Sequence, residues 1–260
     1  MINATLSFHM DSKHSERHDL RQIYVSYADP SRSESNIYYE HNMTREQAYH
    51  LLFDDAVREY NSRQTRNDRK IGNYLSNLLA AEQKQDDFVA QKKREGATVK
   101  ELAKYKKCTR PSYQFIVTIG NMHDNPEFKA DGEKSDTVTK ILSDYMNSFQ
   151  ARNQNAFMYN AAIHKDEAGV IHLHASVIFY ADGFASGMYR RVSQNRALAA
   201  MEFVSDKEKS KDGNYQLAIE KWQNREREVL RVMCLEKDIT IVHGNASRQH
   251  LTREQYVIEQ

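Results

Sequence analysis

The chain has 260 residues, of which 40% are hydrophobic and 28% charged, and its formal net charge is +1. This length and composition fit a globular protein with a substantial core, and no apolar run approaches the roughly 20 residues that span a bilayer. The N-terminus lacks a charged segment followed by an apolar one, so we expect no secretory signal. Cys108 and Cys234 have no C-x-x-C partner, which favours free thiols in a reducing cytoplasm.

The first forty residues combine short apolar runs with polar clusters. Residues 5–8 and 22–25 are candidates for short strands. Between them, residues 13–18 read Lys-His-Ser-Glu-Arg-His, which composition alone assigns to a solvated loop. A turn-rich stretch then begins at Asp29-Pro30.

A long helical segment is expected at about 44–106. Thr44 and Gln47 have the spacing of a capping box, and further helices are predicted over 73–95 and 97–106. Residues 61–110 contain 13 Lys and Arg against 6 Asp and Glu, a local excess of +7 in a nearly neutral chain. Such an excess indicates either a solvated face or contacts with phosphates; the residues at the first break between helices are Arg63, Arg66, Arg69 and Lys70.

The second half alternates strands and helices. Strands are predicted at 113–119 and 239–242, and on both sides of a polar turn at 165–169. Ser135 is predicted to cap a helix over 136–150, and later helices are expected at 190–203 and 214–236. The chain is therefore predicted to be one α/β (α+β) domain, with a mostly antiparallel or mixed sheet and helices on one face.

One hairpin gathers side chains that can bind a metal. His172 and His174 are two residues apart on a predicted strand and so point to the same face. His164 ends the preceding apolar run, and Glu167 lies in the turn between the two strands. Three imidazoles and a carboxylate that converge suit a divalent transition metal with an open coordination position.

A histidine-rich site alone leaves several chemistries open, including a hydrolase and a cupin-type oxygenase. The sequence has no H-E-x-x-H helix, which excludes a zincin protease, and no Walker-type loop, which disfavours an ATP-driven enzyme.

Motifs in two regions of the chain resemble those of a known family. An H-x-D-E turn followed by H-x-H, here residues 164–174, is similar to the metal motif of the HUH endonucleases, and within them of the MobV (Pre/Mob) plasmid mobilisation relaxases. This version lacks a proline and is one residue longer in the turn. The family's K-H-N-E-R element resembles residues 13–17, and its N-P-S-R-S-x-x-N-Y element resembles residues 29–38. The resemblance covers the whole chain as a single relaxase domain, without the C-terminal oligomerisation region that members usually carry.

The resemblance implies metal-dependent nicking of one DNA strand at a plasmid transfer origin, with covalent attachment to the 5′ end. The metal would be Mn²⁺ or Mg²⁺, held by His164, His172 and His174. In this branch a histidine is the nucleophile, which corresponds to His14. His18 is a neighbouring alternative, and the tyrosine alternatives are Tyr24, Tyr27, Tyr38 and Tyr39.

The remaining roles follow from chemistry. Glu167 is expected either to complete the metal sphere or to orient and deprotonate the nucleophile. Arg17 and Arg32 are candidates for phosphate contacts, and the basic segment 61–110 would follow the DNA backbone. The expected partner is single-stranded or extruded-hairpin origin DNA, in the cytoplasm, with a homodimer left open.

Two other functions stay open at this stage. A rolling-circle replication initiator or transposase of the same superfamily would use a tyrosine, here Tyr189 or Tyr215. A DNA-binding repressor without catalysis would show no metal-dependent nick. A hydrolase of small molecules is disfavoured by the long basic helical insert.

Overall fold

The computed structural model describes residues 1–11, 16–23, 28–105, 109–208 and 215–242. Its centre is an antiparallel sheet in which β2 (Leu6–Asp11), β4 (Tyr113–Ile119), β6 (His172–Ala181), β5 (Ala156–His164) and β3 (Ile37–Tyr38) lie in that order. A sixth strand, β7 (Arg191–Val192), pairs with the end of β6. A separate parallel pair joins β1 (Ile2–Ala4) to β8 (Ile239–Ile241).

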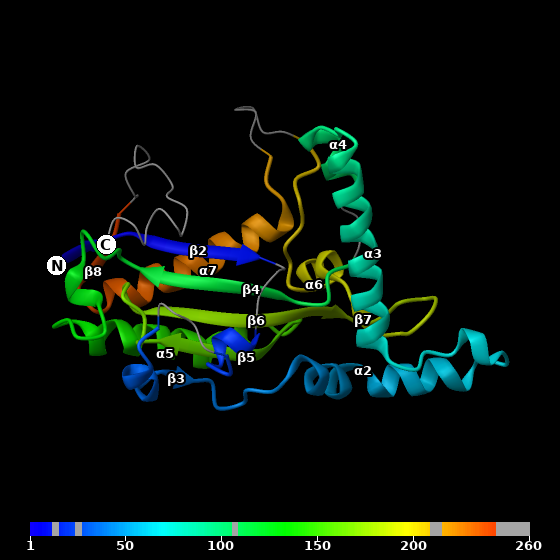
Figure 1. The fold of residues 1–260 in the computed structure, drawn as a ribbon, viewed down its shortest axis with the longest axis horizontal. Helices are drawn as coiled ribbons and strands as arrows, with labels where there is room; N and C mark the ends of the chain where they lie inside the picture. Colours follow the sequence, from blue (N-terminus) through cyan, green and yellow to red (C-terminus); the bar gives the residue numbers. More distant parts are fainter. Residues whose placement is uncertain (12–15, 24–27, 106–108, 209–214, 243–260) are drawn as a thin grey trace.

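The helices pack on both sides of this sheet (Figure 1). In chain order they are α1 (Glu16–Asp19), α2 (Arg45–Ser62), α3 (Tyr74–Arg94), α4 (Val99–Tyr105), α5 (Ser135–Arg152), α6 (Gln194–Ala200) and α7 (Ala218–Leu235). The described residues also include short 3-10 helices: η1 (Pro30–Ser35), η2 (Asn67–Arg69) and η3 (Pro126–Phe128). None of the helices in the described ranges is both long and apolar enough to cross a membrane.

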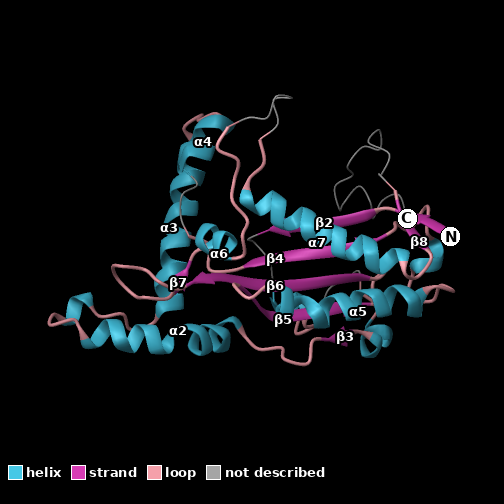
Figure 2. Cartoon of the chain, turned by 180° about the vertical axis from the view of Figure 1, so that it is seen from behind, coloured by secondary structure: helices cyan, strands magenta, loops and turns pink. Residues whose placement is uncertain are grey.

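The main core lies between the sheet and helices α5 and α7, which cross in front of the strands in Figure 2. Alternate residues of each strand point to this side, as strand geometry requires; they include Phe115 and Val117 on β4 and Leu173 and Val177 on β6. Trp222 of α7 is fully buried against Phe8, Phe115 and Phe179. This core fixes β4, β5 and β6 as a rigid platform.

The opposite face of the same strands is only partly covered by helices. A second core forms where α2 and α3 pack on Tyr159 of β5 and Ile178 of β6. Residues 172, 174, 176 and 178 share this face, because side chains along a strand alternate. The histidine pair of β6 therefore lies on the face of α2 and α3, nearer to the start of the strand. The prediction of helices on one face only was wrong.

Several predicted elements are confirmed. The strand over 113–119, the capping box of Thr44 with Gln47, and the three helices within 44–106 form as expected. The hairpin of β5 and β6 also forms, with His164 opposite His172. In the first forty residues a strand covers 6–11, whereas residues 22 and 23 are not in a strand and 24–25 lie outside the described ranges.

Other boundaries were wrong for identifiable reasons. The helix predicted over 190–203 begins only at Gln194, because Arg191 and Val192 pair with β6 and Ser193 accepts the backbone N–H of Arg196 as the cap. Ser135 is the first residue of α5 and not its cap. The last long helix begins at Ala218 and not at 214. Leu217 occupies the cap position, and its backbone N–H donates to the Glu220 side chain. The Leu217 side chain is 45% exposed and lies outside the core.

Candidate metal centre

The three predicted metal ligands come together at one end of the hairpin. His164 is the last residue of β5 and lies opposite His172, the first residue of β6. The ring centroids are 5.4 Å apart for His164 and His172, 5.1 Å for His172 and His174, and 4.7 Å for His164 and His174. One ligand atom from each ring lies within 4.8 Å of the others, so the hairpin brings together the set that the sequence predicted.

Hydrogen bonds at the outer nitrogens of these rings decide which nitrogen stays unprotonated. His164 Nε2 lies 2.8 Å from the backbone oxygen of Asp19, and His172 Nδ1 lies 3.0 Å from that of Val170. A carbonyl accepts only from N–H, so His164 keeps a lone pair on Nδ1 and His172 keeps one on Nε2. His174 Nδ1 lies 3.2 Å from a carboxylate oxygen of Asp19, a charge contact rather than a hydrogen bond. Such outer partners orient metal-binding imidazoles.

Glu167 is the fourth member of the cluster. One of its carboxylate oxygens lies 3.4 Å from His164 Nδ1 and the other 3.7 Å from His172 Nε2. Both nitrogens carry lone pairs by the assignment above, so neither can donate to the carboxylate. The buried His164 Nδ1 has no hydrogen-bond partner within the described residues. Lone pairs that face one another at these distances fit a bound cation, which would accept from all of them.

Burial also keeps the imidazoles neutral. The pKa of His172 is lowered and that of His174 is well below its usual value, first because burial disfavours the imidazolium. Burial opposes ionisation of Glu167 as well, but its interactions with His164, His172 and Arg21 outweigh this effect and lower its pKa. Neutral imidazoles beside an ionised carboxylate are the protonation states that a divalent metal requires.

The neighbouring Asp166 connects the stretch at 29–38 to the hairpin that carries the histidines. Its side chain is fully buried and accepts hydrogen bonds from Ser33 at 2.7 Å, from Asn36 at 2.8 Å and from Arg21 Nε at 2.7 Å. Asn36 in turn receives the backbone N–H of Lys165 at 2.7 Å. The stretch at 29–38 therefore holds the turn that carries Glu167, which explains its place in the motif.

Helix α1 lies against the metal cluster and brings a fourth histidine to it. His18 Nε2 is 3.9 Å from a carboxylate oxygen of Glu167, and its ring centroid is 5.7 Å from that of His164 and 5.6 Å from that of His174. His18, His164 and Glu167 form a second group whose ligand atoms lie within 4.8 Å of one another. The predicted nucleophile, His14, lies outside the described residues.

Arg21 anchors the end of α1 to the same turn. Its guanidinium donates from Nη2 to Asp166 at 2.5 Å and to Glu167 at 2.8 Å. The backbone of Arg21 has a φ of 53°, in the left-handed region that non-glycine residues seldom adopt. Backbone strain of this kind, on the order of 1–3 kcal/mol, is held only where surrounding contacts fix it. We therefore regard Arg21 as a residue that positions Glu167.

The predicted phosphate-binding residues fall into two groups. Arg17 is exposed on α1, next to the cluster, and Arg32 donates to the backbone oxygen of Glu167 at 3.3 Å. The others lie on the connection between α2 and α3, which projects past the opposite end of the sheet in Figure 1; they are Arg63, Arg66, Arg69 and Lys70. His172 starts β6 and Ala181 ends it, so the two groups are separated by roughly 30 Å at about 3.3 Å per residue.

The tyrosine alternatives differ in position. Tyr38 pairs with Ala162 on β5, and cross-strand partners share a face, so Tyr38 lies on the face of the histidines. Tyr189 follows the far end of β6, away from the cluster. Tyr215 precedes α7, and Tyr24 and Tyr27 lie outside the described residues.

Three residues of the site were missed from sequence. Asp19 and Arg21 adjoin the polar cluster at 13–18, and Asp166 stands beside Glu167 in the H-x-D-E turn. Only a fold that brings α1 onto the hairpin reveals their roles. The spacing of His18 and Arg21, which repeats that of His14 and Arg17, was the one available signal.

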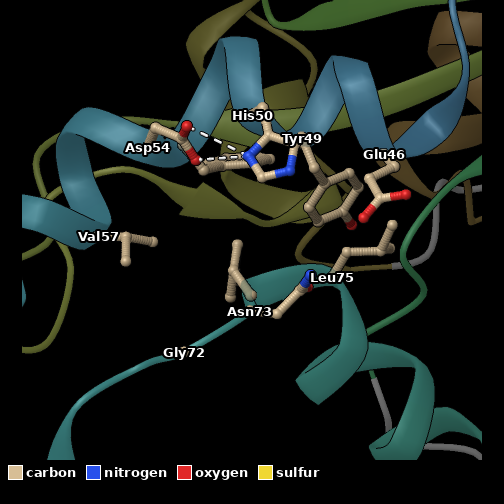
Figure 3. A pocket seen from close by; sticks show the side chains of 10 residues that line it. Glu46, Tyr49, His50, Asp54, Val57, Gly72, Asn73 and Leu75 are labelled. Atoms are coloured by element: carbon tan, nitrogen blue, oxygen red, sulfur yellow. Dashed lines mark hydrogen bonds and ion pairs between the residues drawn. The ribbon is translucent and has the colours of Figure 1, made fainter.

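A pocket elsewhere in the molecule is separate from this site. It lies between α2 and the start of α3 and is lined by Tyr49, Phe53 and Leu75, with the exposed pair of His50 and Asp54 at its rim (Figure 3). His50 and Asp54 are four residues apart on one helix, a common surface pair.

The comparisons with known proteins point to one group of structures. The chain matches no protein-family model and no curated protein. Among solved structures it is similar to a manganese-bound crystal structure of the MobM relaxase domain (MOBV; Mob_Pre) bound to 22-nucleotide oriT DNA of plasmid pMV158 at pH 5.5. The identity is 14% and the TM-score 0.49, over 98% of this chain and 100% of that one. A second crystal form of that complex, with a 3′-thiophosphate, has 16% identity and a TM-score of 0.46 over 98% of each chain. The family named for these structures, MOBV, is the one whose motifs the sequence resembles.

Proposed function

We propose that this chain is a metal-dependent DNA relaxase, a single nicking domain that cuts one strand at a plasmid transfer origin and stays attached to the 5′ end. The observation that carries the proposal is the convergence of His164, His172 and His174, whose ligand atoms lie within 4.8 Å of one another. Glu167 lies 3.4 Å from His164 Nδ1, and His18 is a further imidazole beside the cluster. The two motifs quoted from the sequence support the same activity. Origin DNA, single-stranded or extruded as a hairpin, is the proposed substrate.

In this proposal His164, His172 and His174 hold Mn²⁺ or Mg²⁺. When bound, the metal would polarise the scissile phosphate and stabilise its developing charge. The outer hydrogen bonds from these rings to Asp19 and Val170 keep the lone pairs directed at the metal. Arg21 holds Glu167 by its Nη2 donor, so the carboxylate keeps its place as substrate enters.

The attacking group is a histidine of the segment 14–18: either His14, as the resemblance implies, or His18, which lies beside the cluster. Burial lowers the pKa of His18, so the ring carries the lone pair that attack requires. A P–N bond to the ring forms as the bond from phosphorus to the 3′ oxygen breaks. The ring nitrogen that does not attack gives its proton to Glu167, whose carboxylate would approach from the present 3.9 Å, and the proton ends on the 3′ oxygen, which leaves as a hydroxyl.

The experiment uses a supercoiled plasmid that carries the DNA flanking the chain's own gene, with Mn²⁺ or with chelator. We expect a metal-dependent nick and a protein-linked 5′ end, whose linked peptide is then mapped. His18→Ala, His14→Ala and Tyr38→Phe are compared, with the exposed His50→Ala as the matched control. An adduct that persists in His18→Ala and disappears in His14→Ala would move the nucleophile to the position that the resemblance implied.

Two outcomes would point elsewhere. An adduct lost only in a tyrosine variant would favour a replication initiator or transposase. Binding of the DNA without any metal-dependent nick would favour a repressor.

A further inference from the structure

Glu16 belongs to the motif at residues 13–17, and the metal cluster does not use it. It is the first residue of α1, whose single turn ends at Asp19. Its carboxylate accepts a hydrogen bond from Tyr159 Oη at 2.8 Å, and the same oxygen lies 3.3 Å from Nε of Arg45. The ion pair is half-buried, so water competes with it only in part. Residues outside the cluster therefore hold one end of α1.

A β-bulge directs Tyr159 toward α1. The pairing of β5 with β6 shifts register between Met158 and Asn160, so Tyr159 is an extra residue on β5. An extra residue of this kind changes the direction of side chains and is often found beside active sites. Tyr159 is fully buried in the second core. Burial and then the charge of Glu16 raise the pKa of its phenol above the ordinary value, so the hydroxyl keeps the proton that it donates.

Arg45 connects the same carboxylate to two further elements. It is the first residue of α2, which begins there because Thr44 and Gln47 form the capping box. Its Nη1 donates at 3.3 Å to Oγ of Ser112, the buried residue directly before β4. Glu16 is thus fixed against α2, β4 and β5.

The other end of α1 is held separately. There the backbone oxygen of Asp19 contacts His164, and Arg21 donates to Asp166. Asn160 and Ser176 share this face of the sheet, but their buried polar atoms have no hydrogen-bond partner within the described residues. A helix of one turn is not stable alone, so the position of α1 depends on the contacts at its two ends.

From these contacts we infer that Glu16 is a positioning residue: Tyr159 and Arg45 hold its carboxylate, and α1 thereby presents the attacking histidine to the phosphate at the metal cluster. The inference rests on the proposed nicking function. It holds whichever histidine attacks, because His14 and His18 are each two residues from Glu16. The reacting atoms must lie about 3–3.5 Å apart, and a misplacement of about 1 Å can slow such a step about 100-fold.

The test separates the rate of nicking from binding. Single-turnover nicking of the supercoiled plasmid is measured at saturating Mn²⁺, and Mn²⁺ affinity by electron paramagnetic resonance. We expect Glu16→Ala to slow the step about 10–100-fold, with KM for DNA and Mn²⁺ affinity unchanged, because the contacts of Asp19 and Arg21 remain. Glu16→Gln should restore part of the rate, since its amide oxygen still accepts from Tyr159.

Tyr159→Phe should also slow the step, because it removes the donor to the same carboxylate. The double variant Glu16→Ala/Tyr159→Phe should be no slower than Glu16→Ala, since the two changes remove one shared contact. The matched control is Tyr49→Phe, which removes a buried hydroxyl that donates to the backbone oxygen of Pro111 at 2.8 Å. We expect it to nick at the wild-type rate.

Hydrogen–deuterium exchange of the metal-bound protein gives a second readout that does not need nicking. The amide of Leu20 donates to the backbone oxygen of Glu16 at 3.0 Å, and that of Gln22 to the backbone oxygen of Arg17 at 2.7 Å. Both should exchange faster in Glu16→Ala, whereas the amides of β4, β5 and β6 should not change. Glu228→Ala, which removes an exposed carboxylate from α7, should leave both readouts unchanged.

The outcomes for Glu16 and for the proposed function are distinguishable. A wild type that does not nick would refute the proposed function, and exchange would then decide whether Glu16 holds α1. Wild-type nicking or wild-type exchange in Glu16→Ala would overturn the inference. A loss of Mn²⁺ affinity as large as the loss of rate would also overturn it, since Glu16 would then act on the metal site.

Discussion

The carboxylates of Glu226 and Glu167, the first buried and the second half-buried, are surrounded in opposite ways. Glu226 of α7 is fully buried and accepts hydrogen bonds from Tyr145 Oη at 2.8 Å, Arg152 Nε at 3.1 Å and Arg225 Nη2 at 2.8 Å. Glu167 has one donor, Arg21, and otherwise faces imidazole nitrogens at 3.4–3.9 Å. The first site is complete with protein donors alone, and the second collects acceptors. That difference separates a structural carboxylate from one that fits a metal.

The largest expected effect is on stability at the structural site. Glu226→Ala should lower the free energy of unfolding by about 3–5 kcal/mol, because Arg152 and Arg225 would remain as buried or half-buried charges without their partner. Urea denaturation of the metal-free protein measures this change. A loss below about 1 kcal/mol would mean that the network does not stabilise the packing of α5 on α7.

The next largest effect is the stabilisation of the folded protein by Mn²⁺, which should depend on the histidine cluster alone. Mn²⁺ at about 100 times its dissociation constant should stabilise the wild type by about 2.7 kcal/mol, because the metal binds the folded state alone. Thermal unfolding with and without metal gives the shift. His174→Ala should abolish the shift, whereas Glu226→Gln should lower the melting temperature and retain it.

Glu167→Gln should change metal affinity more than stability, the opposite of what we expect for Glu226→Ala. The metal-free protein should lose less stability than Glu226→Ala does, because Arg21 keeps its hydrogen bonds to Asp166. Metal affinity should fall about 10–100-fold, as for partners that complete a metal site. Manganese titration followed by electron paramagnetic resonance tests this, and an unchanged affinity would assign Glu167 to the nucleophile alone.

A smaller effect is expected where the N-terminal motif supports the turn. Asn36→Ala removes a donor to Asp166 and the acceptor of the Lys165 N–H, which should cost about 1–3 kcal/mol. Chemical denaturation measures the loss. Leu217→Ala is the control from the surface, where we expect a change within about 0.5 kcal/mol.

The sequence predicted those parts of the fold that depend on local pattern. The strand over 113–119 and the helices of the insert follow from residue periodicity, and the ligand set follows from the alternation of His172 and His174 on one strand. Helices on both faces could not be predicted, because β5 and β6 are buried along both sides and periodicity does not say what covers each side. The start of α7 at Ala218 was missed for a different reason, because an apolar residue such as Leu217 can occupy the cap position of a helix.

The residues of the site also divide into those that the sequence could group and those that it could not. The hairpin ligands are close in sequence and could be grouped, whereas Asp19 and Arg21 reach the cluster across about 145 residues of chain. Long-range polar contacts of this kind leave no periodic signal. The positions of His18 and Arg21 beside Glu167 are therefore what the structure adds.

The central claim, that the hairpin histidines hold a divalent metal, is tested most directly by counting Mn²⁺ bound per chain with electron paramagnetic resonance. We predict one tightly bound ion in the wild type and in the His50→Ala control, and none in His172→Ala/His174→Ala. Binding of one ion by that double variant with the affinity of the wild type would contradict the claim.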